Sequence, residues 1–179
     1  MRVITGAARG RRLKEPENQD IRPTTDRVKE AMFNICRGDV EGRRVLDLFG
    51  GTGQLGIEAG SRGAAEVTIV DSGRTAVELI RENIDRTGLD IRVVREDALG
   101  FLQRDGVYDL IFLDPPYGSG LVEKALEMIK SFDKLSIGGI IICETDAIAV
   151  LPEPEPPYLR LREYRYGKVK LTTYTKQRS

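Results

Sequence analysis

The sequence predicts an α/β protein with a doubly wound, mostly parallel sheet that ends in an antiparallel hairpin. Short apolar runs alternate with segments of helical periodicity from about residue 24 to residue 144. A glycine-rich turn joins the first apolar run to the helix after it, and the last two β-rich runs are separated by one glycine. Alternating strands and helices form parallel sheets, whereas strands joined by a tight turn pair in antiparallel fashion.

The first half of the chain supplies a leading helix and three strands. Apolar residues at helical spacing predict a helix over 24–35, with Thr24 or Thr25 as its N-cap. Apolar and β-branched residues then predict strands at 45–48, 66–70 and 91–95. The helices expected between them cover 55–62 and 74–86, and Gly88 closes the second one.

The second half continues the same alternation and then changes. We expect a short helix at 98–102, a strand at 108–113, a helix at 121–129 and a strand at 137–144. The prolines at 152–157 exclude a helix interior there. Residues 158–166 and 168–175 alternate around Gly167 and predict a terminal hairpin, which brings the sheet to seven strands.

The 179 residues suit one domain, expected over 1–179, with a basic N-terminal arm at 1–20. No apolar run approaches the roughly 20 residues that span a bilayer. The first residues lack the pattern of a secretory signal, so we expect a cytoplasmic protein without a membrane partner.

The chain offers few residues that could act as nucleophiles or bind a metal. The chain has no histidine, which excludes Ser-His-Asp and Cys-His mechanisms and the usual zinc hydrolase sites. Cys36 and Cys143 are far apart and lie in apolar patterns, so we expect buried thiols and no metal site.

Charge is balanced overall but not along the chain. The 28 basic and 28 acidic residues cancel, while both ends of the chain are basic. Arg9, Arg11 and Arg12 near the start, and Lys168 in the terminal hairpin, are candidate contacts for RNA phosphates if the ends converge. Two solvated basic tails remain the alternative.

The glycine-rich turn is the first candidate site. Gly51, Gly53 and Gly56 satisfy G-x-G-x-x-G between a strand and a helix, and Asp71 follows at the offset expected for a ribose-binding acid. Glycines let the backbone approach a ligand closely. The motif predicts an adenosine cofactor, and a glycine turn without a ligand is the alternative.

Acidic residues at the strand ends help to identify that cofactor. Asp47, Asp71, Asp97 and Asp114 fall at the C-terminal ends of predicted strands, at the edge where doubly wound sheets bind ligands. Four carboxylates would repel the pyrophosphate of NAD and suit a cofactor with a sulfonium and an ammonium group. They therefore favour S-adenosyl-L-methionine.

The Asp-Pro-Pro-Tyr turn at 114–117 is the second candidate site. An exocyclic amine on a base is a poor nucleophile, because its lone pair is delocalised into the ring. The Asp114 carboxylate and the Pro115 carbonyl can accept its two hydrogens, and Tyr117 offers a ring for the base to stack on. A plain surface turn is the alternative.

Two weaker candidates flank these motifs. The segment Arg-Pro-Thr-Thr-Asp-Arg at 22–27 leads into the first helix, where Arg27 and the helix N-terminus can hold a cofactor carboxylate. Asp97 and Ala98 can position an adenine amino group. An ordinary helix cap is the alternative at both places.

Motifs along nearly the whole chain form a recognisable set. They lie at 9–11, 22–31, 33–34, 47–53, 55–59, 61–64, 114–117 and 166–167. Together they resemble the bacterial 16S rRNA guanine-N2 methyltransferases of the RsmD type. Gly50 replaces the usual alanine, Gln54 stands where a small residue is common, and Ser72 and Gly73 replace bulkier residues.

This resemblance implies the class I, Rossmann-like methyltransferase fold, S-adenosylmethionine as cofactor and 16S rRNA or the small ribosomal subunit as partner. It implies cofactor roles for a set of strand-end and turn residues, namely Asp47, Gly50, Gly51, Thr52, Gly53, Asp71 and Asp97. It implies that 114–117 holds the target amine.

Other activities stay open. DNA adenine-N6 and protein-glutamine-N5 methyltransferases use related Pro-Pro-Tyr turns, although the sequence predicts no large DNA-recognition domain, which speaks against the DNA activity. A nucleotide-binding oxidoreductase or a module that binds S-adenosylmethionine without catalysis are alternatives from other classes.

Overall fold

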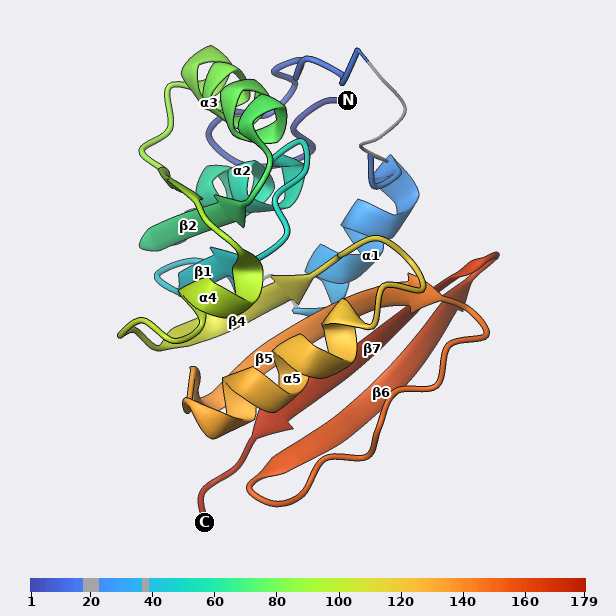
Figure 1. Ribbon diagram of the computed structural model, residues 1–179. Helices are drawn as coiled ribbons and strands as arrows, with labels where there is room; N and C mark the ends of the chain where they lie inside the picture. Colours follow the sequence, from blue (N-terminus) through green and yellow to red (C-terminus); the bar gives the residue numbers. More distant parts are fainter. Residues whose placement is uncertain (18–22, 37–38) are drawn as a thin grey trace.

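Within residues 1–17, 23–36 and 39–179, the computed structural model has one sheet of seven strands in the order β3-β2-β1-β4-β5-β7-β6 (Figure 1). The strands are β1 (Arg44–Asp47), β2 (Glu66–Asp71), β3 (Arg92–Arg95), β4 (Tyr108–Leu113), β5 (Leu135–Asp146), β6 (Tyr158–Tyr166) and β7 (Val169–Lys176). The first five strands pair in parallel, and β7 pairs antiparallel with both β5 and β6. The predicted fold class is confirmed.

The helices match the predicted segments to within a few residues. They are α1 (Asp26–Ile35), α2 (Gln54–Ser61), α3 (Arg74–Thr87), α4 (Ala98–Phe101) and α5 (Leu121–Ser131). Thr25 caps α1 by accepting a hydrogen bond from the Val28 amide, and Gly88 ends α3 in the left-handed conformation. The largest difference is β5, which extends beyond 137–144 at both ends, because Leu135 pairs with Tyr108 of β4 and residues 145–146 pair with β7.

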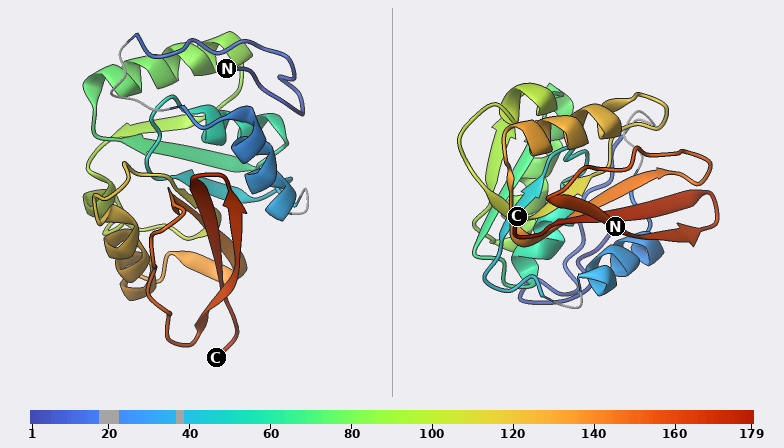
Figure 2. Two further views of the ribbon diagram at one scale, coloured as in Figure 1. Left: turned by 90° about the vertical axis from the view of Figure 1, so that its right-hand side faces the viewer. Right: turned by 90° about the horizontal axis from the view of Figure 1, so that it is seen from below.

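Helices cover both faces of the sheet and create two cores. Along β4, Leu110 and Phe112 pack with α1, α2 and α3, whereas Ile111 and Leu113 pack with α4 and α5. This alternation follows from the two-residue period of a strand. Figure 2 shows α1 and α5 on opposite sides of the sheet. The arrangement leaves the carboxyl ends of the parallel strands open for a site.

The basic N-terminal segment is packed against the domain over the part that the structure describes. Residues 1–13 fold back on themselves, with an isolated bridge between Arg2 and Arg12. The amides of Ile4 and Thr5 donate to the carboxylate of Glu58, at 2.9 and 3.0 Å, and Glu58 is fully buried. The segment expected at 1–20 is therefore held on α2 as far as it is described.

No helix in the described ranges combines the length and the apolar character that crossing a membrane requires.

Candidate active site

A cavity of about 720 Å³ opens where the parallel strands end. The glycine turn after β1 and the Asp-Pro-Pro-Tyr turn after β4 both contribute to its wall. The lining residues used below are Thr24, Gly51, Asp71, Asp97, Ala98, Asp114, Pro115, Tyr117 and Glu144. The two motifs that the sequence singled out therefore face one shared space.

The glycine turn is held tightly between β2 and α3. Gly53 adopts φ 80° and forms the N-cap of α2, a conformation that side chains disfavour. A Cβ on Gly50 would lie 2.5 Å from Cγ2 of Ile69, so the turn packs directly on β2. Gly50, Thr52 and Gly53 thus shape the turn from behind, and Gly51 faces the cavity.

Asp71 is fixed at the end of β2 by two backbone amides. Its Oδ2 accepts a hydrogen bond from Gly51 N at 2.9 Å, and its Oδ1 accepts one from Gly73 N at 2.8 Å. Each carboxylate oxygen has a second lone pair. A preorganised acceptor of this kind suits the two hydroxyls of a ribose.

Asp97 and Ala98 lie at the start of the four-residue helix α4. Asp97 Oδ2 accepts a hydrogen bond from Gly100 N at 2.9 Å, so the helix-cap interpretation is confirmed. Both residues also line the cavity.

Asp47 lies behind the glycine turn and is only 1% exposed. Its Oδ2 accepts from Gly56 N at 3.1 Å, while its Oδ1 has no hydrogen-bond partner among the described residues. Burial raises the pKa of Asp47 to about 7; the Gly56 amide opposes this shift, and the charge of Asp71 adds to it. A cation nearby would stabilise the ionised form.

Asp114 is held by a chain of hydrogen bonds from the other side of the cavity. Thr24 Oγ1 donates to Asp114 Oδ2 at 2.9 Å, and Gln54 Nε2 donates to the Thr24 carbonyl at 2.9 Å. Gln54 is almost fully buried at the start of α2. Gln54, which follows the glycine turn, thereby supports the Asp-Pro-Pro-Tyr turn through Thr24.

Glu144 on β5 is a site residue that the sequence reasoning missed. Leu113 pairs with Cys143, so the next residues, Asp114 and Glu144, lie side by side. Burial raises the pKa of Asp114 well above its usual value; the charge of Glu144 raises it further, and the Thr24 hydrogen bond opposes the shift. No motif in the sequence marks Glu144, which the pairing of β4 with β5 brings to the site.

Tyr117 links the turn to β5. Its hydroxyl donates to Glu144 Oε1 at 2.8 Å, and the side chain is half-buried. The hydrogen bond fixes one end of the ring against the cavity wall.

Arg27 lies away from this cavity. It is exposed on α1, with its guanidinium 5.9 Å from the centre of the Tyr166 ring on β6. The first turn of α1 therefore contacts the terminal hairpin, and Arg27 is not among the described lining residues. Arg22, at the start of the same motif, lies outside the described residues.

The candidate RNA contacts occupy two segments that α1 connects. Arg9, Arg11 and Arg12 are exposed on the N-terminal segment, and Lys168 is exposed at the turn between β6 and β7. Asp26 of α1 forms an ion pair of 3.6 Å with Arg2, and Arg27 contacts the hairpin. Figure 2 (left) shows the N-terminal segment, α1 and the hairpin on one side of the molecule.

Both cysteines are buried, as expected. Burial raises the pKa of Cys36 to about 12 and raises that of Cys143 as well. Neither thiol is ionised near neutral pH, so neither is activated as a nucleophile.

Comparisons with known proteins agree with this arrangement. The sequence profile of the family described as conserved hypothetical protein 95 matches residues 1–175. The chain is 33% identical to ribosomal RNA small subunit methyltransferase D of Escherichia coli, over 99% of this chain and 90% of that protein. It is 37% identical to YlbH of Bacillus subtilis, over 99% of this chain and all of YlbH. The solved structure of yhhF from Escherichia coli superposes with a TM-score of 0.87 at 31% identity, covering 100% of this chain and 99% of yhhF.

Proposed function

The chain belongs to the family described as conserved hypothetical protein 95 and is a methyltransferase, and we propose that it methylates N2 of a guanine in small-subunit ribosomal RNA. The methyl donor is S-adenosylmethionine. One observation carries this proposal: the glycine turn with its strand-end carboxylates and the Asp-Pro-Pro-Tyr turn line the same cavity.

The cavity fits the donor in size and in charge. Its volume of about 720 Å³ is within the range of small-molecule and cofactor sites. Asp71 would accept the ribose hydroxyls, and Asp97 with Ala98 would lie at the adenine. The buried carboxylate of Asp47, with one oxygen unpartnered among the described residues, favours a cationic ligand over a pyrophosphate. When bound, S-adenosylmethionine supplies an electrophilic methyl group on a sulfonium.

Asp114 and Pro115 act on the target amine. The Asp114 carboxylate and the Pro115 carbonyl accept its two hydrogens, which localises the nitrogen lone pair. Proline fixes the backbone that aims this carbonyl. The raised pKa of Asp114 also suits it to receive the proton that the amine releases. Holding the reacting groups in line contributes roughly 7–11 kcal/mol to lowering such barriers.

Tyr117 positions the base. A guanine must leave its stack to reach the turn, and an aromatic ring compensates for the lost stacking. The hydrogen bond to Glu144 holds the ring in place before the base arrives.

The exposed cations supply the contacts with RNA phosphates. Arg9, Arg11 and Arg12 would bind on one side of α1, and Lys168 on the other. A substrate in 16S rRNA or in the small subunit places the protein in the cytoplasm with the ribosome.

The deciding experiment combines methyl transfer with mapping. The chain is incubated with labelled donor and, separately, with small subunits, 16S rRNA, DNA or protein, and the labelled residue is identified by mass spectrometry. We expect N2-methylguanosine in rRNA with the wild type and none with Asp114→Ala. Label in DNA adenine or in protein glutamine would support the related methyltransferases instead.

Thermal stability tests the cofactor separately. S-adenosylhomocysteine at 100 times its dissociation constant adds about 2.7 kcal/mol to the stability of the folded state. Stabilisation by NAD alone would indicate an oxidoreductase and refute the proposal.

A further inference from the structure

A loop beside the cavity exposes two branched apolar side chains. Ile148 is 87% exposed and Val150 is 84% exposed, and both follow the end of β5. Exposed loops usually carry polar residues, and full burial of a side chain of this size contributes roughly 1.5–3 kcal/mol. Two such side chains two positions apart on a loop indicate a surface that becomes covered.

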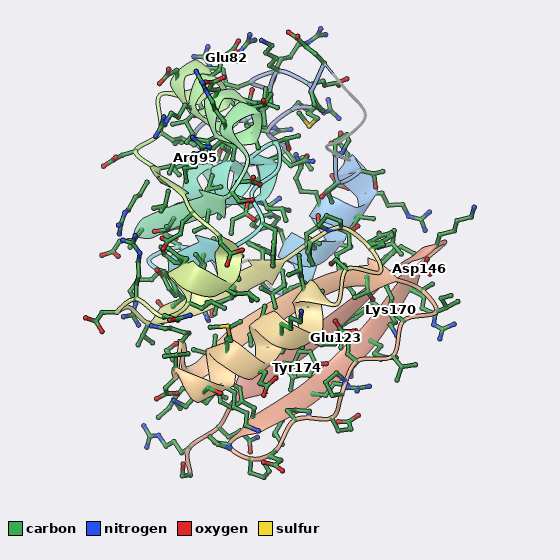
Figure 3. All side chains as sticks on the ribbon, viewed as in Figure 1. Glu82, Arg95, Glu123, Asp146, Lys170 and Tyr174 are labelled. Atoms are coloured by element: carbon green, nitrogen blue, oxygen red, sulfur yellow. The ribbon has the colours of Figure 1, made fainter. Side chains whose placement is uncertain are left out.

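The loop is anchored to β7. Ala147 N donates to the Lys168 carbonyl at 2.9 Å, and Ile148 N donates to Asp146 Oδ1 at 3.1 Å. The ammonium group of Lys170, itself 3% exposed, donates to the Ala149 carbonyl. Figure 3 shows Asp146 and Lys170 close together at the ends of β5 and β7. The apolar side chains are therefore presented by a preorganised backbone.

A groove connects this loop to the catalytic turn. It has a volume of about 90 Å³ and is lined on one side by residues 115–120 and on the other by residues 144–146 and Ala149. Four of its residues, Pro115, Pro116, Tyr117 and Glu144, also line the main cavity. The groove thus shares the wall at Tyr117 with the main cavity and reaches the loop at Ala149, which Ile148 and Val150 flank in the sequence.

We propose that Ile148 and Val150 bind the base of the nucleotide adjacent to the target guanine. This inference rests on the function proposed above. Removing the guanine from its stack leaves an exposed face on the neighbouring base. Apolar side chains commonly cover or wedge such faces. The groove adjoins the turn that holds the target amine. The nucleotide next to the guanine can therefore enter the groove while the guanine occupies the main cavity.

The charges of the groove favour a base over a phosphate. Glu123 and Asp146 contribute carboxylates to its lining, and these repel phosphate and accept hydrogen bonds from base amino groups. Lys168, whose carbonyl holds the loop, is exposed and available for the phosphate outside the groove.

The first test measures methyl transfer to small subunits by Ile148→Ser with Val150→Ser. We expect about a tenfold rise in KM for the subunits, the size of one lost base contact, with kcat and the affinity for S-adenosylhomocysteine unchanged. Ile148→Leu with Val150→Ile should restore KM. Ile137→Ser is the matched control, because Ile137 is 58% exposed and lies near the opposite end of β5.

The second test places the photocrosslinker benzoylphenylalanine at position 148. We expect a crosslink to the nucleotide next to the methylated guanine. A crosslink to a ribosomal protein, or an unchanged KM in the Ser variants while the wild type methylates rRNA, would overturn this inference alone. A wild type that methylates no rRNA would instead refute the proposed function.

Discussion

The hydroxyl of Thr24 donates a hydrogen bond of 2.9 Å to Oδ2 of Asp114. It joins the segment before α1 to the turn after β4, and it opposes the effect of Glu144 on the same carboxyl group. The hydrogen bond favours the ionised carboxylate, whereas burial and the charge of Glu144 favour the protonated one. Asp114 is therefore held between two partners with opposite effects on its pKa.

Thr24→Val should move the acid limb of the rate profile to higher pH. Losing the donor removes an interaction that lowers the pKa of Asp114, so the carboxylate protonates at a higher pH. The measurement is kcat/KM for methyl transfer as a function of pH. Thr24→Ser retains the hydroxyl and should return the limb to its wild-type position. An acid limb that stays in place in Thr24→Val would show that Asp114 does not determine it.

Glu144→Gln should move the same limb to lower pH. The substitution removes the neighbouring charge that raises the pKa of Asp114 and keeps an oxygen that can accept from the Tyr117 hydroxyl. Combined with Thr24→Val, it should give an intermediate profile. A shift toward higher pH would contradict the assigned electrostatics.

Asp47→Asn should stabilise the protein without cofactor increasingly as the pH rises from 4 to 7. Burial raises the folded-state pKa of Asp47 to about 7, well above that of an aspartate in the unfolded chain, so the folded state binds an extra proton in this range. The wild type therefore loses up to a few kcal/mol from this group as the pH rises.

Urea unfolding across this pH range measures the difference between Asp47→Asn and the wild type. Asp85→Asn, an exposed aspartate on α3, is the control. A difference that is constant with pH would rule out the raised pKa of Asp47.

Reversing Arg11 and Arg12 to Glu should weaken RNA binding and leave the affinity for S-adenosylhomocysteine unchanged. The logarithm of the RNA-binding constant falls linearly with the logarithm of the salt concentration, and each lost phosphate contact makes this slope shallower by about 1. Filter binding at several salt concentrations measures both effects. Reversing Arg92 and Arg178, which are exposed elsewhere, changes the net charge equally. RNA affinity equal to the wild type in the Arg11 and Arg12 variant would place the RNA on another face.

Gly50→Ala should destabilise this chain by about 1–3 kcal/mol. The added Cβ would lie 2.5 Å from Cγ2 of Ile69 and 2.9 Å from Cδ1 of Ile80. Thermal unfolding should show a midpoint roughly 2–4 °C lower for each kcal/mol of lost unfolding free energy. Pairing it with Ile69→Ala should give a loss smaller than the sum of the two single losses. Strictly additive losses would mean that the two side chains do not compete for space.

Local sequence patterns predicted the elements well because each depends on nearby residues. Thr25 begins α1 and Gly88 ends α3 through contacts within one turn, and the glycine motif between β1 and α2 is contiguous. The site also depends on contacts between residues that are far apart in the sequence. Glu144 joins it through the β4–β5 register, and Thr24 reaches Asp114 from 90 residues away. Arg27 was expected at the cofactor, but helix packing turns it toward Tyr166.

The position of β7 between β5 and β6 has a consequence for biosynthesis. Among the strands of the described residues β7 is translated last, yet it occupies an interior place in the sheet. Until it emerges from the ribosomal tunnel, residues 140–146 of β5 present an unpaired edge, which is prone to association with other chains. The nascent polypeptide therefore completes this sheet only after β7 has been translated, and shortening it before β7 would leave that edge permanently unprotected.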